Sequence, residues 1–175
     1  MPVIAPSGED RSVPLHAFAF HVSFDLPAFA RIDKPLLGGF TDVTGLEASM
    51  EARAIPAGGR NYGPVQRAGP VTFSTVVLKR GVVESRHLWQ WFAAFAGAPP
   101  APGASGDAAA ANGAWGMRGD VTVTMLRGAE PVFGWVLRRA MPVKFRAGDL
   151  NAQSGELAVE ELHLAHEGLE MEVAS

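Results

Sequence analysis

The chain has 175 residues, of which 47% are hydrophobic and 19% charged, and its formal net charge is -3. This length corresponds to about one domain, and the apolar content can bury a core, which excludes a chain that is disordered throughout. The small net charge argues against a nucleic-acid binder that relies on bulk electrostatics. Because the chain has no cysteine, disulfide scaffolds, thiol nucleophiles and cysteine-ligated metal sites are excluded.

The first residues have the composition of a flexible arm, which we place at 1–14 because three prolines and few apolar residues fall there. The same segment lacks the basic start and apolar centre of a secretory signal, so we expect synthesis in the cytoplasm. Residues 15–175 are predicted to form a single domain. It carries a low-complexity loop insertion at 97–116, rich in alanine, glycine and proline, which we expect to be mobile.

Alternation of apolar and polar residues, the pattern of half-buried strands, recurs along the chain. The clearest case is 17–25, where Phe18, Phe20, Val22 and Phe24 share one face. Further strands are predicted at 40–44, 46–55, 71–79, 120–126, 132–146 and from 156 to about 166. Residues 56–70 consist of turn-forming residues, and the prolines among them predict that strand pairing stops there.

Two irregularities are predicted within these strands. Pro142 lacks the backbone N–H that a ladder needs, which indicates an edge position or a bulge. In the last predicted strand the apolar phase slips between Val159 and Leu162, which predicts a β-bulge near Glu160 and Glu161.

One segment changes to a helical period, with an apolar stripe at i, i+3, i+4 and i+7 formed by Leu88, Trp91, Phe92 and Phe95. We predict a helix at 85–96, with Ser85 as its N-cap and Gly97 just after its end. The four tryptophans of the chain are interpreted as core residues rather than as a ligand-binding box. The fold class is therefore mainly β, with two packed antiparallel sheets, as a barrel or sandwich, and one flanking α-helix.

No catalytic set is visible, so we predict that the protein is not an enzyme and needs no cofactor or small-molecule substrate. The chain has no nucleophile elbow and no phosphate-binding lysine motif. The cluster of His163, His166 and Glu167 is the one metal-like pattern. On a strand, residues i and i+3 point to opposite faces, so we expect no metal there. Glu160 and Glu161 likewise face apart and do not form a catalytic pair.

Charge is unevenly distributed towards the end of the chain. Arg138, Lys144 and Arg146 share one face of a predicted strand, whereas 156–175 holds six glutamates and no lysine or arginine. A nucleic-acid stripe on a net acidic chain is the weaker interpretation. The basic strand and the acidic stretch can instead pair within one chain, or head to tail between copies.

Eight segments in the same order resemble the tail tube protein family of contractile phages and extracellular contractile injection systems, a phage T4-like tail tube family. They cover roughly 17–170 and are 18–24 (FAFHVSF), 39–46 (GFTDVTGL), 58–61 (GGRN), 77–81 (VLKRG), 88–91 (LWQW), 135–144 (WVLRRAMPVK), 149–152 (DLNA) and 160–168 (EELHLAHEG). In the sixth segment Arg139 stands where the family pattern has asparagine, and Met141 where it has tryptophan.

The resemblance implies an inner-tube subunit that forms homohexameric rings, which stack into a hollow conduit inside a contractile sheath. Sheath contraction then drives the tube through a target membrane. The implied partners are further copies of the chain, the sheath protein, baseplate and hub proteins, and a cargo in the lumen. The implied particle is a phage tail or phage tail-like particle made in bacteria and, in some systems, released from the cell. The type VI secretion tube is a structural relative of this family.

The family's long loop reaches the neighbouring ring and maps here onto about residues 47–70. The residues expected at contacts between rings or subunits are therefore Glu47, Glu51, Arg53, Arg60, Asn61, Tyr62, Arg67, Lys79 and Arg80. Two alternatives remain at this point. One is a tube-initiating or baseplate-proximal paralogue of the same machine, suggested by the extra arm and the 97–116 insertion. The other is a β-barrel that binds a ligand or a metal.

Overall fold

The computed structural model describes residues 19–26, 39–97, 118–149, 153 and 157–173. The predicted arm and all but the first residue of the predicted insertion lie outside the described residues. Within the described part, an antiparallel sheet is ordered β1-β6-β7-β8-β5-β2, and β9 also pairs with β7. These strands are β1 (Phe20–Asp25), β2 (Asp42–Thr44), β5 (Val76–Gly81), β6 (Gly119–Arg127), β7 (Glu130–Arg146), β8 (Val159–Ala165) and β9 (Gly168–Val173).

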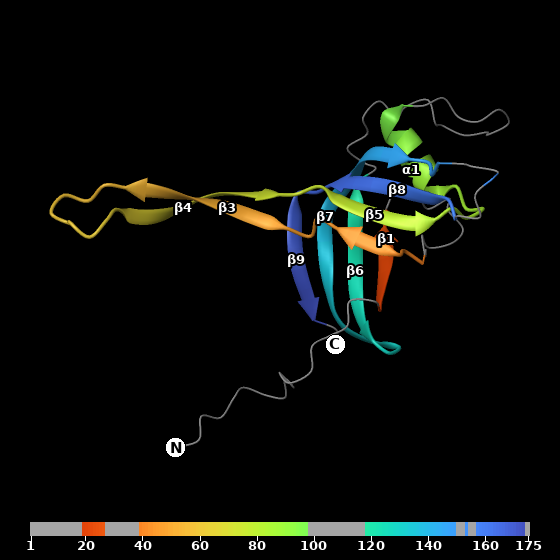
Figure 1. Cartoon of the computed structure of the whole chain (residues 1–175), viewed down its shortest axis with the longest axis horizontal. Coiled ribbons are helices and arrows are strands. Elements are labelled where there is room, and N and C mark those ends of the chain that lie inside the picture. Colours follow the sequence, from red (N-terminus) through yellow and green to blue (C-terminus); the bar gives the residue numbers. More distant parts are fainter. Residues whose placement is uncertain (1–18, 27–38, 98–117, 150–152, 154–156, 174–175) are drawn as a thin grey trace, which may run out of the picture.

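Strand β7 belongs to two sheets because it changes partners along its length. Its first part pairs with β6 and β9, and its last part pairs with β8. Between these parts Arg139 has a φ of 49°, the left-handed conformation, which bends the strand. In Figure 1, β1, β6, β7 and β9 run down the view, whereas β2, β5 and β8 run across it. The predicted pair of packed antiparallel sheets is therefore confirmed.

The core lies between the two sheets and beneath helix α1 (His87–Ala96). Trp91 is fully buried and meets the ring of Phe24 edge-on, with 5.9 Å between the ring centroids. Trp135 packs against the core and is partly buried, whereas Trp89 is half exposed over Phe145. The helix predicted from the apolar stripe is confirmed, and Gly97 ends it in a left-handed conformation. The predicted N-cap is wrong: Arg86 holds that position without a side-chain cap.

Strands β3 (Ala48–Ile55) and β4 (Val65–Phe73) form a separate two-stranded hairpin that extends far from the sheets (Figure 1). The prediction that strand pairing stops throughout 56–70 is wrong. Pairing resumes at Val65, and the register shifts between Met50 and Ala52, so that Gly69 and Pro70 lie opposite Glu51. A bulge tolerates a proline because its extra residue leaves the ladder.

The end of the chain differs from the prediction in two ways. Strand β8 pairs with β5 in continuous register through Glu160 and Glu161, so no bulge occurs there. The apolar phase slips because Glu160 takes an inward position, where it is buried beside Arg80, while Val159 faces out. The irregularity lies instead in β7 between Pro142 and Lys144, as Pro142 predicted. Strand β9 was missed although Leu169, Met171 and Val173 alternate with two glutamates, which is the period of a half-buried strand.

Candidate assembly surface

The outstanding exposed feature is the hairpin formed by β3, β4 and the loop between them, residues 48–73, which we call the projecting hairpin. Every residue of β3 is exposed, and so are most residues of β4. Cross-strand partners lie on the same face of a pair. One face carries small and apolar side chains and is called the alanine face: Ala48, Met50, Ala52, Ala54, Gln66, Ala68, Val71 and Phe73. The opposite face is called the arginine face: Ser49, Glu51, Arg53, Ile55, Val65, Arg67 and Thr72.

Short contacts join the two segments of the chain at the base of the projecting hairpin. The backbone N–H of Ser74 donates to the Glu47 carbonyl over 3.1 Å, and the Ser74 hydroxyl donates to the Glu47 carboxylate over 3.2 Å. Gly45 has a φ of 84°, and a Cβ there would lie 2.2 Å from the Thr75 carbonyl oxygen. Only glycine fits this close approach. These contacts hold the two segments together where they lead from β2 into β3 and from β4 into β5.

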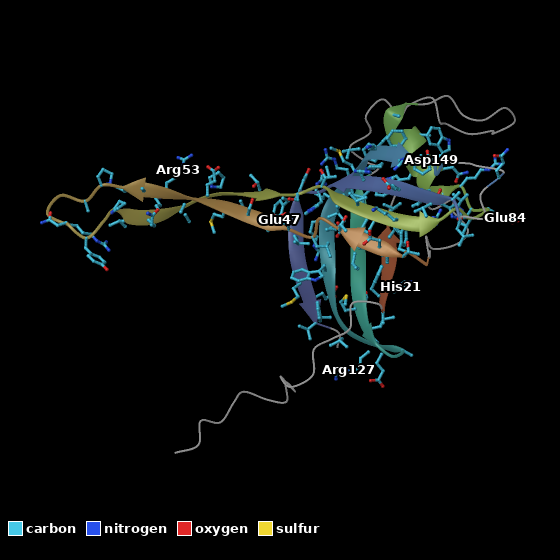
Figure 2. All side chains as sticks on the ribbon, in the orientation of Figure 1. His21, Glu47, Arg53, Glu84, Arg127 and Asp149 are labelled. Carbon is cyan, nitrogen blue, oxygen red and sulfur yellow. The ribbon has the colours of Figure 1, made fainter. Side chains whose placement is uncertain are left out.

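The arginine face holds two like charges side by side. Arg53 and Arg67 are direct cross-strand partners, and they line a shallow hollow together with Ala68, Gly69 and Pro70. Within the described residues neither guanidinium has a hydrogen bond or an ion pair. Like charges directly opposite one another destabilise a strand pair, so this face favours a negatively charged partner. Figure 2 places Arg53 well along the hairpin, far from the core.

The predicted contact residues fall into three places. Glu51, Arg53 and Arg67 lie on the arginine face, whereas Arg60, Asn61 and Tyr62 lie in the loop at the hairpin tip, where Tyr62 is 98% exposed. Glu47 lies at the base. Lys79 lies on the outer side of β5, where its ammonium is 3.4 Å from the Asp42 carboxylate.

Arg80 does not belong to this surface and must be removed from the predicted set. Its side chain points into the core and is 3% exposed. Its guanidinium pairs with Glu160, donates to the Ser85 carbonyl over 3.3 Å and lies 5.7 Å from the centre of the Phe40 ring. Neighbouring strand residues face opposite ways, so Lys79 and Arg80 could not both face outward. The ion pair between Arg80 and Glu160 instead links β5 to β8, and the bond from Arg80 to Ser85 links both to the segment before α1.

A second exposed apolar surface was missed by the sequence reasoning. It lies where β5 ends and β8 begins, and it consists of Val82, Val83, Leu157 and Val159, with Leu157 89% exposed. The N–H of Val82 donates to the Ala158 carbonyl over 2.9 Å, which holds the two segments together. We call these four residues, with the neighbouring Glu84, the far-end patch. Its members come from two distant segments, so only pairing between β5 and β8 could reveal it.

The three arginines of β7 have carboxylate partners within the chain. Arg138 donates to Glu170 over 2.8 Å and to Asp120 over 2.6 Å, and Arg139 donates to Glu167 over 2.8 Å. Arg146 donates to Asp149 over 2.8 Å. Arg138 and Arg139 therefore pair with the acidic stretch 156–175 of the same chain, which is the internal pairing considered above.

Asp120 is the carboxylate at the centre of this network, and its pKa lies below the ordinary value of 3.8. Desolvation by burial alone would raise the pKa of Asp120. The backbone N–H of Arg139, which donates over 2.9 Å, and the guanidinium of Arg138 outweigh that effect. The pKa of Arg138 is raised by its hydrogen bond to Glu170 and, to a smaller extent, by its hydrogen bond to Asp120. The network therefore holds both groups in their charged forms.

His163, His166 and Glu167, the metal-like pattern of the sequence, each contact different groups. Within the described ranges, no three histidine or acidic side chains converge on one point. His163 Nε2 lies 3.5 Å from Glu161, whereas the Nδ1 of His166 is 2.8 Å from the Gly168 carbonyl and its ring packs on Phe73. In the same described ranges, no helix has the length and apolar character needed to cross a membrane.

Comparison with solved structures supports the fold. A structure of the anti-feeding prophage baseplate matches with 25% identity and a TM-score of 0.69, covering 91% of this chain and 96% of that one. A sheath-tube complex of the extracellular contractile injection system PVC matches with 19% identity and a TM-score of 0.67, covering 94% and 95%. A type six secretion system protein matches with 8% identity and a TM-score of 0.52, covering 89% and 83%.

Comparison of sequences identifies the family. No curated protein matches the chain. Residues 16–170, however, match the family described as T4-like virus tail tube protein gp19, and this span includes the core, α1 and the projecting hairpin. The protein is therefore a structural component of a tail-like particle rather than an enzyme, and it belongs to the T4-like tail tube protein family.

Proposed function

We propose that this protein is the inner-tube subunit of a contractile tail or injection system, and that it forms hexameric rings which stack into a hollow conduit. The observation that carries this proposal is the projecting hairpin. A two-stranded hairpin is at best marginally stable in water, yet this one extends from the sheets with an apolar face exposed. A neighbouring subunit that covers the alanine face would supply the missing packing.

The remaining strand edges are consistent with a ring. Strands β1, β2 and β9 each pair on one side only within the described residues. Open edges invite uncontrolled pairing, and closing the copies into a ring satisfies them within a closed symmetry. A head-to-tail stack of rings does not close, so it grows into a filament.

The proposed partners follow from this role. They are further copies of the chain, a contractile sheath that drives the tube through a target membrane, baseplate and hub proteins, and cargo in the lumen. The sheath is supported by the match to the PVC sheath-tube complex. We further propose synthesis in the bacterial cytoplasm and, in the mature particle, release outside the cell.

Negative-stain electron microscopy and light scattering of the purified full chain test the proposal. We expect stacked rings or tubes. A shortened variant would join Ala52 to Ala68, which are cross-strand partners, through an Asn-Gly turn that suits a two-residue hairpin. It should fold and form single rings that do not stack. A wild-type chain that stays monomeric under all conditions, or a shortened variant that still forms tubes, would contradict the proposal.

A tube-initiating or baseplate-proximal paralogue is the second candidate, favoured by the match at 25% identity to a structure of a baseplate. Such a subunit would form rings that do not stack on their own but that start tube growth from another tube protein. Light scattering separates the two roles, because a main-tube subunit grows in mass with concentration whereas an initiator stops at one ring.

A further inference from the structure

Within the described residues, seven of the thirteen exposed large apolar side chains belong to two groups at the ends of the molecule's longest axis (Figure 1). Ile55, Tyr62 and Val65 lie along the outer part of the projecting hairpin. The far-end patch, Val82, Val83, Leu157 and Val159 with Glu84, lies at the opposite end, where Figure 2 places Glu84. Monomeric proteins rarely expose contiguous apolar patches without a partner. A head-to-tail contact needs two different complementary surfaces on opposite sides of one subunit.

We propose that the arginine face of the projecting hairpin docks on the far-end patch of a second copy in the next ring. The inference rests on the proposed function and names the two surfaces that meet. Ile55 and Val65, which are cross-strand partners, lie against the valines and Leu157 of the patch. Arg53 and Arg67 lie against the Glu84 carboxylate.

Charge supports this pairing. The hairpin sequence contains three arginines and one glutamate, a local excess of positive charge. Glu84 is exposed, and within the described residues its carboxylate has no ion pair or hydrogen bond. A carboxylate placed between two guanidinium groups relieves their repulsion and forms charge-assisted hydrogen bonds. Arg86 also lies near Glu84 in sequence, at the start of α1, so the match depends on Glu84 itself rather than on the net charge of that end.

Two variants of the full chain test the two surfaces separately. The hairpin variant carries Arg53→Glu and Arg67→Glu, and the far-end variant carries Leu157→Glu. Each altered side chain is exposed, so each subunit should fold with an unchanged thermal midpoint and should form single rings. We expect the stacked fraction to fall by more than about tenfold, because every subunit of a ring repeats the weakened contact. Arg127→Glu, which makes the same change at an exposed arginine at the end of β6, away from both the hairpin and the far-end patch (Figure 2), is the matched control and should still stack.

Mixing the two variants gives the sharpest readout. Rings of the far-end variant keep an intact hairpin, and rings of the hairpin variant keep an intact patch. One good interface then forms between unlike rings, and both outer faces of that pair are inactive. We expect pairs of rings and no tubes in the mixture. A chain that carries Arg67→Glu together with Glu84→Arg should recover stacking relative to either single change.

The outcomes distinguish this inference from the proposed function. Normal tubes from the far-end variant, or a mixture with no ring pairs, would overturn the inference while wild-type tubes leave the proposed function standing. Loss of stacking in the Arg127→Glu control would also count against it, because the effect would not be specific to the two proposed surfaces. If Leu157→Glu fails to fold, Val82→Glu and Glu84→Arg replace it in the same mixing experiment. If wild-type chains form neither rings nor tubes, the proposed function fails first.

Discussion

The two-sheet body and the projecting hairpin are both antiparallel β-structure, but the body buries its apolar side chains whereas the hairpin exposes them. In the body, strand residues that face inward meet other strands or α1, and Val22, Leu78 and Leu137 are fully buried. In the hairpin, both faces of β3 are exposed along its whole length. The body is therefore stabilised by packing within the chain, whereas the hairpin needs packing against a bound partner.

Charges follow the same division. In the body, Arg80, Arg138 and Arg139 each have a carboxylate partner from another strand or turn. In the hairpin, Arg53 faces Arg67. A buried or networked charge is part of the fold, whereas an unpaired one on an exposed strand is available to a second molecule. The paired arginines of the body therefore stabilise the fold, whereas the unpaired arginines of the hairpin can bind a second molecule.

The largest expected loss of stability follows from removing one partner of the buried ion pair between Arg80 and Glu160. Arg80→Met leaves the Glu160 carboxylate buried without a cation, and the free energy of unfolding should fall by about 3–5 kcal/mol. Urea unfolding followed by circular dichroism measures the change. The double variant Arg80→Met and Glu160→Leu should regain most of it, because no lone charge then remains buried. A single variant as stable as the wild type would contradict the structural role of the pair.

An intermediate effect compares the same substitution in the two regions. At Gly119 an added Cβ would lie 2.2 Å from the Asp25 carbonyl oxygen, and at Gly69 it would lie 2.4 Å from the Glu51 carbonyl oxygen. Gly119→Ala should lower the free energy of unfolding by about 1–3 kcal/mol, the cost of forcing atoms into a packed site. Gly69→Ala should leave global unfolding nearly unchanged and should reduce tube formation. Equal losses of stability from both substitutions would mean that the hairpin is part of the cooperative body.

The smallest expected effect concerns Asp120 and acid. Because the pKa of folded Asp120 is below its ordinary value of 3.8, its charged form stabilises the fold above that value. This contribution is lost as the pH falls through the folded pKa. Asp120 is partly exposed, so we expect less than about 1 kcal/mol. Asp120→Asn should remove the corresponding part of the loss seen between about pH 5 and pH 2. An identical pH profile in both proteins would show that the network does not contribute.

Short-range patterns were enough to predict most of the body. The alternation around Val22 predicted β1, and the stripe through Leu88 and Trp91 predicted α1, because side-chain period follows directly from backbone geometry. Pro142 correctly indicated an irregularity in β7 for the same kind of reason. These features depend on a residue and its near neighbours.

The features that sequence reasoning missed depend on distant partners. Glu160 looked like a break in the pattern of β8, but it is an inward charge whose partner, Arg80, lies 80 positions away. Gly69 and Pro70 were expected to end strand pairing, but they form a bulge opposite Glu51 on the other strand. The predicted contact residues on the hairpin could be grouped by sequence, whereas the far-end patch needed the pairing of β5 with β8.

The connection between hairpin and body has a mechanical consequence. Strand β4 continues through Ser74 and Thr75 directly into β5, which is hydrogen-bonded to β8 on one side and β2 on the other. In Figure 1 the hairpin and β5 run along the same direction. Strand β2 also continues into the hairpin, through β3, so tension along the hairpin pulls β2 and β5 together. Hydrogen bonds in an antiparallel sheet lie perpendicular to the strands, so this tension shears the ladder between β5 and β8 instead of opening it bond by bond. A subunit built in this way resists axial pulling in the direction in which the hairpin leaves the body.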